Sequence, residues 1–149
     1  MFPDDFKEWL KLLQEKKIEY LLVGGYALAF HGFPRNTGDI DIWINRRRDN
    51  IALILEALSD FGFSSFNLTG DDFLKTDSVI QLGIAPLRID IITDIDGVSF
   101  EEAFTRRAVF TFEGLSINLI SREDLIKIKT ASGRYIDLAD VKKLTYKLS

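Results

Sequence analysis

Apolar residues recur at helical spacing near both ends of the chain and predict most of its helices. Phe6, Trp9 and Leu13 fall three or four positions apart, so the first helix is expected to bury one apolar side. Ser99 and Ser121 each precede a polar first turn, which is typical of a helix N-cap. The predicted helices cover residues 4–17, 26–30, 49–61, a short segment after 99, 121–131 and a last segment after 133, for which Ile136, Leu138, Val141, Leu144 and Leu148 supply an apolar side.

Shorter apolar or alternating runs predict strands between these helices. Gly24-Gly25 ends the first of them, and Glu113-Gly114 separates the last two in the manner of a hairpin. Residues 64–77 are polar and weakly patterned, and they predict a loop or a short helix around residues 71–74. The predicted strands are 19–23, 38–44, 79–83, 87–92, 108–112 and 115–120.

This order of elements predicts an α+β fold with a mixed β-sheet flanked by helices. The chain has 149 residues and no linker or repeat, so we expect one domain over residues 1–149, with C-terminal helices from about residue 121. Hydrophobic residues make up 46% and charged residues 28%, which is ordinary for a globular protein, and the net charge of −4 disfavours general nucleic-acid binding.

The sequence also excludes several classes of site. There is no cysteine and only one histidine, so disulfides and thiolate or histidine zinc sites are not expected. We expect no membrane association, because no run of about 18 apolar residues exists. The first residues lack the features of a signal peptide, and the expected location is the cytoplasm.

Aspartates in two predicted strands are the main candidates for chemistry. Asp39 and Asp41 alternate with isoleucines, so both carboxylates point to one face of their strand. Asp90 repeats the pattern in the run Arg88-Ile89-Asp90-Ile91, and it would join them if the two strands are neighbours. Three such carboxylates suit a hard divalent cation such as Mg²⁺. The simpler alternative is a solvated sheet face, although aspartate is depleted in strands.

Gly24 and Gly25 add a second candidate feature. A strand followed by two glycines and a short helix offers backbone N–H groups that attract phosphate. A plain tight turn would explain the same pair. No Gly-Lys-Ser/Thr follows, so this is not a P-loop, and the dinucleotide fingerprint Gly-x-Gly-x-x-Gly is absent.

Taken together, these segments resemble the nucleotidyltransferase superfamily that includes DNA polymerase beta. The resemblance rests on Val23-Gly24-Gly25, on Asp39-Ile40-Asp41 and on Asp90. Residues 27–39 look like the small stand-alone prokaryotic members, which include nucleotidyltransferase toxins of abortive-infection systems. The tail, with Lys129, Gly133-Arg134 and the Asp-Leu-x-Asp of residues 137–140, is similar to the same branch.

The resemblance implies transfer of a nucleoside monophosphate from an NTP to a hydroxyl acceptor, with release of pyrophosphate. The acceptor class stays open among RNA (such as tRNA), protein and small molecules. In this scheme Asp39, Asp41 and Asp90 hold two Mg²⁺ ions, with Mn²⁺ as an alternative. The nucleotide-binding candidates are Gly24, Gly25, Arg35, Thr37 and Lys129, and for Lys129 the alternative is a surface helix lysine.

Four further residues have expected roles, and two other functions stay open. His31 is expected to anchor the glycine turn, Arg134 and Asp137 to pair, and Trp43 either to stack on a base or to cover the sheet. The first alternative function is a catalytically silent member that binds a nucleotide or a cognate partner, as in a toxin–antitoxin pair. The second is an unrelated α+β interaction domain.

Overall fold

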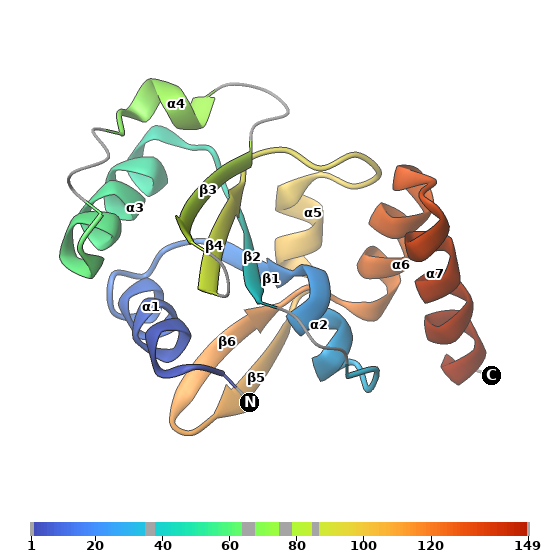
Figure 1. The fold of residues 1–149 in the computed structure, drawn as a ribbon. Coiled ribbons are helices and arrows are strands. Elements are labelled where there is room, and N and C mark those ends of the chain that lie inside the picture. The colour runs from blue at the N-terminus through green and yellow to red at the C-terminus, as the bar shows by residue number, and fades with distance from the viewer. Residues whose placement is uncertain (1, 35–37, 64–67, 75–78, 85–86, 149) are drawn as a thin grey trace.

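A computed structural model describes residues 2–34, 38–63, 68–74, 79–84 and 87–148. The chain forms a six-stranded mixed sheet with helices on both sides (Figure 1), which confirms the predicted α+β class. The strands are β1 Tyr20–Val23, β2 Asp39–Ile44, β3 Val79–Ile84, β4 Leu87–Ile92, β5 Ala108–Phe112 and β6 Leu115–Leu119, in the spatial order β3-β4-β2-β1-β6-β5.

The centre of the sheet positions the candidate residues. β1 is antiparallel to β2, and β2 is parallel to β4, so the two strands with aspartates are direct neighbours. The isoleucines that alternate with the aspartates are buried, because they face the core. One apolar face of each strand therefore fixes which way the polar side chains point.

Helices cover both faces of this sheet. Figure 1 shows α1 and α3 on one side and α5, α6 and α7 on the other. The apolar stripe of α1 is fully buried, as its spacing predicts. None of the helices in the described part of the chain has the length and apolar character needed to cross a membrane. The helices are α1 Asp4–Glu15, α2 Gly24–Phe30, α3 Arg48–Phe61, α4 Gly70–Leu74, α5 Phe100–Thr105, α6 Arg122–Ser132 and α7 Tyr135–Leu148.

Several predicted boundary signals are present. The side chains of Ser99 and Ser121 accept hydrogen bonds from backbone N–H groups at the starts of α5 and α6. Residues Glu113 and Gly114 both have positive φ at the tip of the β5–β6 hairpin, as a tight two-residue turn requires. α6 ends at Gly133, whose φ of 68° is the left-handed conformation typical of a helix C-terminus.

The predicted apolar side of α7 is wrong at Ile136 and Leu138, whereas Leu144 is buried as expected. Ile136 is 57% exposed and Leu138 is 39% exposed, whereas Asp137 and Asp140 are buried together with Leu144. The inward face of α7 is therefore partly acidic. An apolar pattern could not predict this, because burial of these aspartates depends on cations contributed by the neighbouring turn and helix.

Candidate active site

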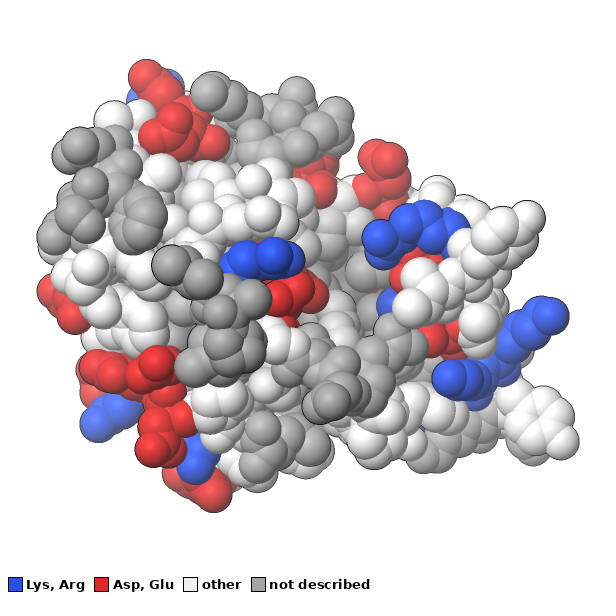
Figure 2. All heavy atoms as spheres, viewed as in Figure 1, with Lys and Arg blue, Asp and Glu red and all other residues white. Residues whose placement is uncertain are grey.

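Asp39, Asp41 and Asp90 line one cavity of about 380 Å³. In the parallel pair of β2 and β4, Asp41 lies opposite Asp90, and Asp39 lies opposite Arg88. The strand alternation that sends the isoleucines into the core thus places the three carboxylates on the opposite face. Figure 2 shows the surface hollowed between the sheet and the α6–α7 pair, with acidic and basic side chains along its walls.

Gly24 makes room for Asp41. Val23, at the end of β1, pairs with Asp41, and α2 begins at the next residue. A Cβ atom on Gly24 would lie 1.9 Å from Oδ2 of Asp41, and Gly24 has a φ of 72°. Only glycine satisfies both conditions. Glycine is therefore required at position 24 by the position of the Asp41 carboxylate, whereas Gly25, the next residue, is half-buried in α2.

Arg88 lies against two of the carboxylates. Its Nε donates to Oδ1 of Asp90 at 2.8 Å, and its Nη2 donates to Oδ2 of Asp90 at 3.1 Å and to Oδ2 of Asp39 at 2.8 Å. The sequence interpretation did not assign a role to Arg88. The signal was present, because Arg88 precedes Asp90 by two residues in a strand and so shares its face.

The electrostatics of Asp41 show that this wall carries excess negative charge. Burial and the neighbouring Asp90 carboxylate raise the pKa of Asp41 to about 7, with Asp39 contributing in the same direction and Arg88 opposing. An additional cation close to the three carboxylates would stabilise their ionised forms.

The carboxylate oxygens of this wall are of the kind that binds a hard divalent ion, but Arg88 occupies two of the three groups. Among the described residues, no three acidic or histidine side chains form a ready metal-binding group. Asp39 and Asp90 instead direct oxygens to the Arg88 guanidinium. Carboxylate oxygens are the ligands that Mg²⁺ and Mn²⁺ prefer. The Asp41 carboxylate lies in the space that a Cβ atom on residue 24 would fill.

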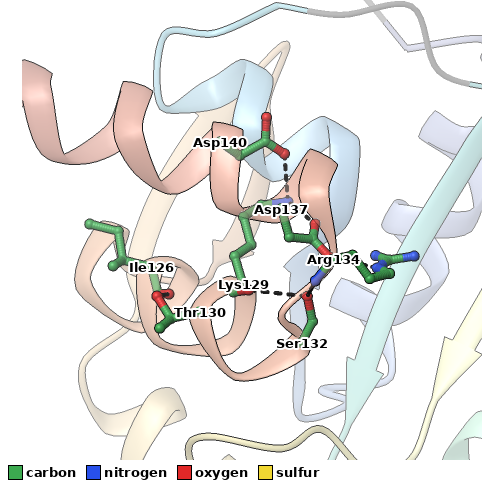
Figure 3. A network of polar contacts seen from close by, with 7 residues as sticks. All are labelled: Ile126, Lys129, Thr130, Ser132, Arg134, Asp137 and Asp140. Carbon is green, nitrogen blue, oxygen red and sulfur yellow. Dashed lines mark hydrogen bonds and ion pairs between the residues drawn. The ribbon is translucent and has the colours of Figure 1, made fainter.

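The facing wall of the cavity is the corner between α6 and α7 (Figure 3). Lys129 is 9% exposed, and its Nζ donates to Oδ1 of Asp137 at 3.1 Å and to Oδ2 of Asp140 at 3.0 Å. It is therefore not the surface lysine of the alternative interpretation. Its ammonium lies between two carboxylates at the edge of the cavity.

Asp137 joins this corner to the cavity mouth. Its Oδ2 accepts hydrogen bonds from Oγ of Ser132 at 2.5 Å and from Nε of Arg134 at 2.7 Å. Burial alone would raise the pKa of Asp137, but hydrogen bonds from Ser132, Arg134 and Lys129 lower it below the usual value. The expected Arg134–Asp137 pair is present, while the Arg134 side chain stays 73% exposed.

Four other residues singled out in the sequence remain, and two of them lie among the described residues. The single histidine, His31, donates from Nε2 to the carbonyl of Ile120 at 2.8 Å, which ties the end of α2 to the residue after β6. Trp43 is 2% exposed and packs edge-on against Phe100, so it covers the sheet and presents no face to a base. Arg35 and Thr37 lie outside the described residues.

Structural comparison identifies the fold. LnuA, a lincosamide antibiotic adenylyltransferase solved with lincomycin bound, matches 97% of this chain and 97% of its own, with 18% identity and a TM-score of 0.62. A protein from Thermotoga maritima assigned as a nucleotidyltransferase matches 95% of this chain and 91% of its own, with 16% identity and a TM-score of 0.61. These are nucleotidyltransferase folds, as the resemblance implied.

A more distant match extends the comparison. An antigenic nucleotidyltransferase-like protein from Paracoccidioides brasiliensis matches 91% of this chain and 71% of its own, with 16% identity and a TM-score of 0.57. No curated protein matches the sequence. The family model "nucleotidyltransferase of unknown function (DUF6036)" matches residues 4–147. The chain belongs to this family of nucleotidyltransferases.

Proposed function

We propose that this nucleotidyltransferase uses Asp39, Asp41 and Asp90 to transfer a nucleoside monophosphate from an NTP to a hydroxyl acceptor. The observation that carries the proposal is that these three carboxylates line one cavity with Gly24, opposite the α6–α7 corner that contains Lys129 and Arg134. A divalent metal, Mg²⁺ or Mn²⁺ and most simply two ions, would supply charge neutralisation of the triphosphate and of the reacting oxygens.

The residues of the chain position the substrate on both sides of the cavity. On the sheet side, we assign backbone contacts with the triphosphate to Gly24, which lines the cavity, and to Gly25, which follows it in α2. On the helix side, the guanidinium of Arg134 is oriented by Asp137 and can donate to phosphate oxygens through its exposed terminal nitrogens. Lys129 adds positive charge behind this contact and holds both aspartates of α7 in place.

The chemistry then follows from the charges. The acceptor hydroxyl oxygen forms a bond to the α-phosphorus as the bond from that phosphorus to the bridging oxygen breaks, and pyrophosphate leaves. Asp90 accepts the hydroxyl proton on a carboxylate oxygen, a role that its low exposure of 8% favours because few waters compete. No covalent enzyme intermediate is required.

The decisive experiment incubates the protein with each NTP, labelled at either the α- or the γ-phosphate, together with Mg²⁺ or Mn²⁺ and fractionated cell extract. We expect labelled pyrophosphate from the γ-labelled NTP. From the α-labelled NTP, we expect transfer of the label to one fraction of RNA, protein or small molecules. Asp41→Asn should abolish both signals. Asp94→Asn is the matched control, because Asp94 lines a separate cavity beside Trp43 and Phe100. Equal activity of the Asp41 variant and the wild type would overturn the proposal.

A further inference from the structure

Arg88 lies on the acidic wall and contacts two of its three carboxylates. Three charge-assisted hydrogen bonds join its guanidinium to Asp39 and Asp90, across the two strands. Such bonds are among the stronger ones in proteins, and the planar guanidinium fixes their geometry. The arginine therefore holds two candidate metal ligands in one arrangement.

The same oxygens cannot serve Arg88 and a divalent ion in full. Oδ1 and Oδ2 of Asp90 both accept from Arg88, and the Asp90 side chain is only 8% exposed, so an ion that binds these oxygens has to displace the guanidinium. A free ion that takes these oxygens leaves the guanidinium without its carboxylates. It also places two positive groups close together in a partly buried site.

A metal–triphosphate complex changes this balance. It brings phosphate oxygens together with the ion, and those oxygens can accept the hydrogen bonds that Arg88 gives up. The net charge added to the wall is also smaller or negative, so repulsion between the ion and Arg88 is offset. Free metal should therefore bind weakly, and metal should bind well in the presence of a triphosphate.

We propose that Arg88 is an internal counter-cation that keeps free divalent ions from binding to the nucleotide-free protein, so that the metal loads together with the NTP. Arg88 is a positioning residue in this scheme, acting through Asp39 and Asp90. The inference rests on the proposed function for the identity of the substrate. It concerns ion binding, which can be measured without turnover.

Manganese binding, measured by electron paramagnetic resonance of the free ion, tests the proposal. For Arg88→Met without nucleotide, we expect Mn²⁺ affinity to rise about tenfold or more over the wild type, since displacement of the guanidinium no longer opposes binding. Arg88→Gln, which keeps a polar side chain, should show the same direction if Arg88→Met folds poorly. Arg48→Met at the exposed start of α3 removes the same charge elsewhere and should leave the affinity unchanged.

A second titration includes an α,β-methylene NTP in its adenine, guanine, cytosine and uracil forms. The wild type should bind Mn²⁺ more tightly with the preferred analogue, and this enhancement should shrink in Arg88→Met. Equal or weaker free Mn²⁺ binding by both Arg88 variants would overturn the counter-cation role. Failure of every analogue to bind the wild type would instead contradict the proposed function, and the free-ion comparison would still decide the role of Arg88.

Discussion

The two walls of the cavity use the same residue types, but only one of them balances its acidic and basic side chains. On the sheet, three carboxylates face the guanidinium of Arg88, and the pKa of Asp41 rises to about 7. At the α6–α7 corner, Asp137 and Asp140 face Lys129 and Arg134, and the pKa of Asp137 falls. The charges of the corner are balanced within the fold, whereas those of the sheet wall are not, so a further cation would stabilise it. Buried aspartates alone therefore do not indicate a metal site, and the proposal of one rests on the unbalanced set.

The largest effect on stability is expected at Lys129. Lys129→Met leaves Asp137 and Asp140 buried without their shared ammonium, and removing one partner of a buried ion pair costs about 3–5 kcal/mol. We expect a loss of this size in the free energy of unfolding measured with urea. Lys127→Met is the control, since the Lys127 side chain is 55% exposed and its loss should change stability little. Similar stability of the two variants would show that the corner is not balanced as described.

Asp41 should show the opposite behaviour, because its charge destabilises the metal-free fold. The folded pKa of about 7 lies above the ordinary aspartate value of 3.8, so the native state binds the proton more tightly than the unfolded state. The stability of the metal-free protein should fall as pH rises from about 4 to about 7. Asp41→Asn removes this term and should stabilise the metal-free protein at pH 8 by at most about 4 kcal/mol.

Urea denaturation at several pH values, with chelator present, checks this expectation. The gain from Asp41→Asn should vanish below about pH 4, where the carboxyl group is protonated in both states. Asp94→Asn should show no comparable pH dependence, since Asp94 lines a separate cavity beside Trp43 and Phe100. A metal-free Asp41→Asn protein that is less stable than the wild type at pH 8 would contradict the charge imbalance.

Gly24 tests the geometry that connects the turn to the acidic wall. Gly24→Ala meets both an unfavourable φ of 72° and the Asp41 carboxylate. Gly133→Ala has a similar φ of 68° but open space around the new methyl group, so it isolates the backbone cost of about 1–2 kcal/mol. We expect Gly24→Ala to be the more destabilising of the two in urea denaturation. The excess should shrink in the Asp41→Ala background, and an excess that persists there would exclude the carboxylate as its cause.

Strand periodicity predicted most of the sheet wall, because alternation is a local property. The isoleucines beside Asp39, Asp41 and Asp90 required a buried face, and that fixed the direction of the carboxylates once β2 and β4 paired. Arg88 shares the same alternation, but its bonds to Asp39 depend on the register between two strands about fifty residues apart. No pattern within one strand gives that register.

The α6–α7 corner was harder to predict, because its burial is a collective property. Lysine and aspartate at helix positions normally indicate a solvated face, so Ile136 and Leu138 were expected inside instead of Asp137 and Asp140. The order reverses only because Lys129, Ser132 and Arg134 supply donors from one turn. The sequence analysis predicted the Arg134–Asp137 pair but not the contacts of Lys129 with Asp137 and Asp140.

Arg134 offers the smallest effect on stability and the finest test of the comparison. Its side chain is 73% exposed, and its ion pair with Asp137 is one of three donors to that carboxylate, so Arg134→Gln should cost less than about 1 kcal/mol. If the corner contributes a phosphate contact, the same change should raise KM for the NTP about tenfold, the scale of one charge-assisted hydrogen bond. Arg134→Lys should recover part of this loss, because a point charge can still reach phosphate without the bidentate geometry. If Arg134 were only structural, stability and KM would change together or not at all. A KM that rises at unchanged stability therefore assigns Arg134 to substrate binding. An unchanged KM restricts the role of the corner to holding α7 in place.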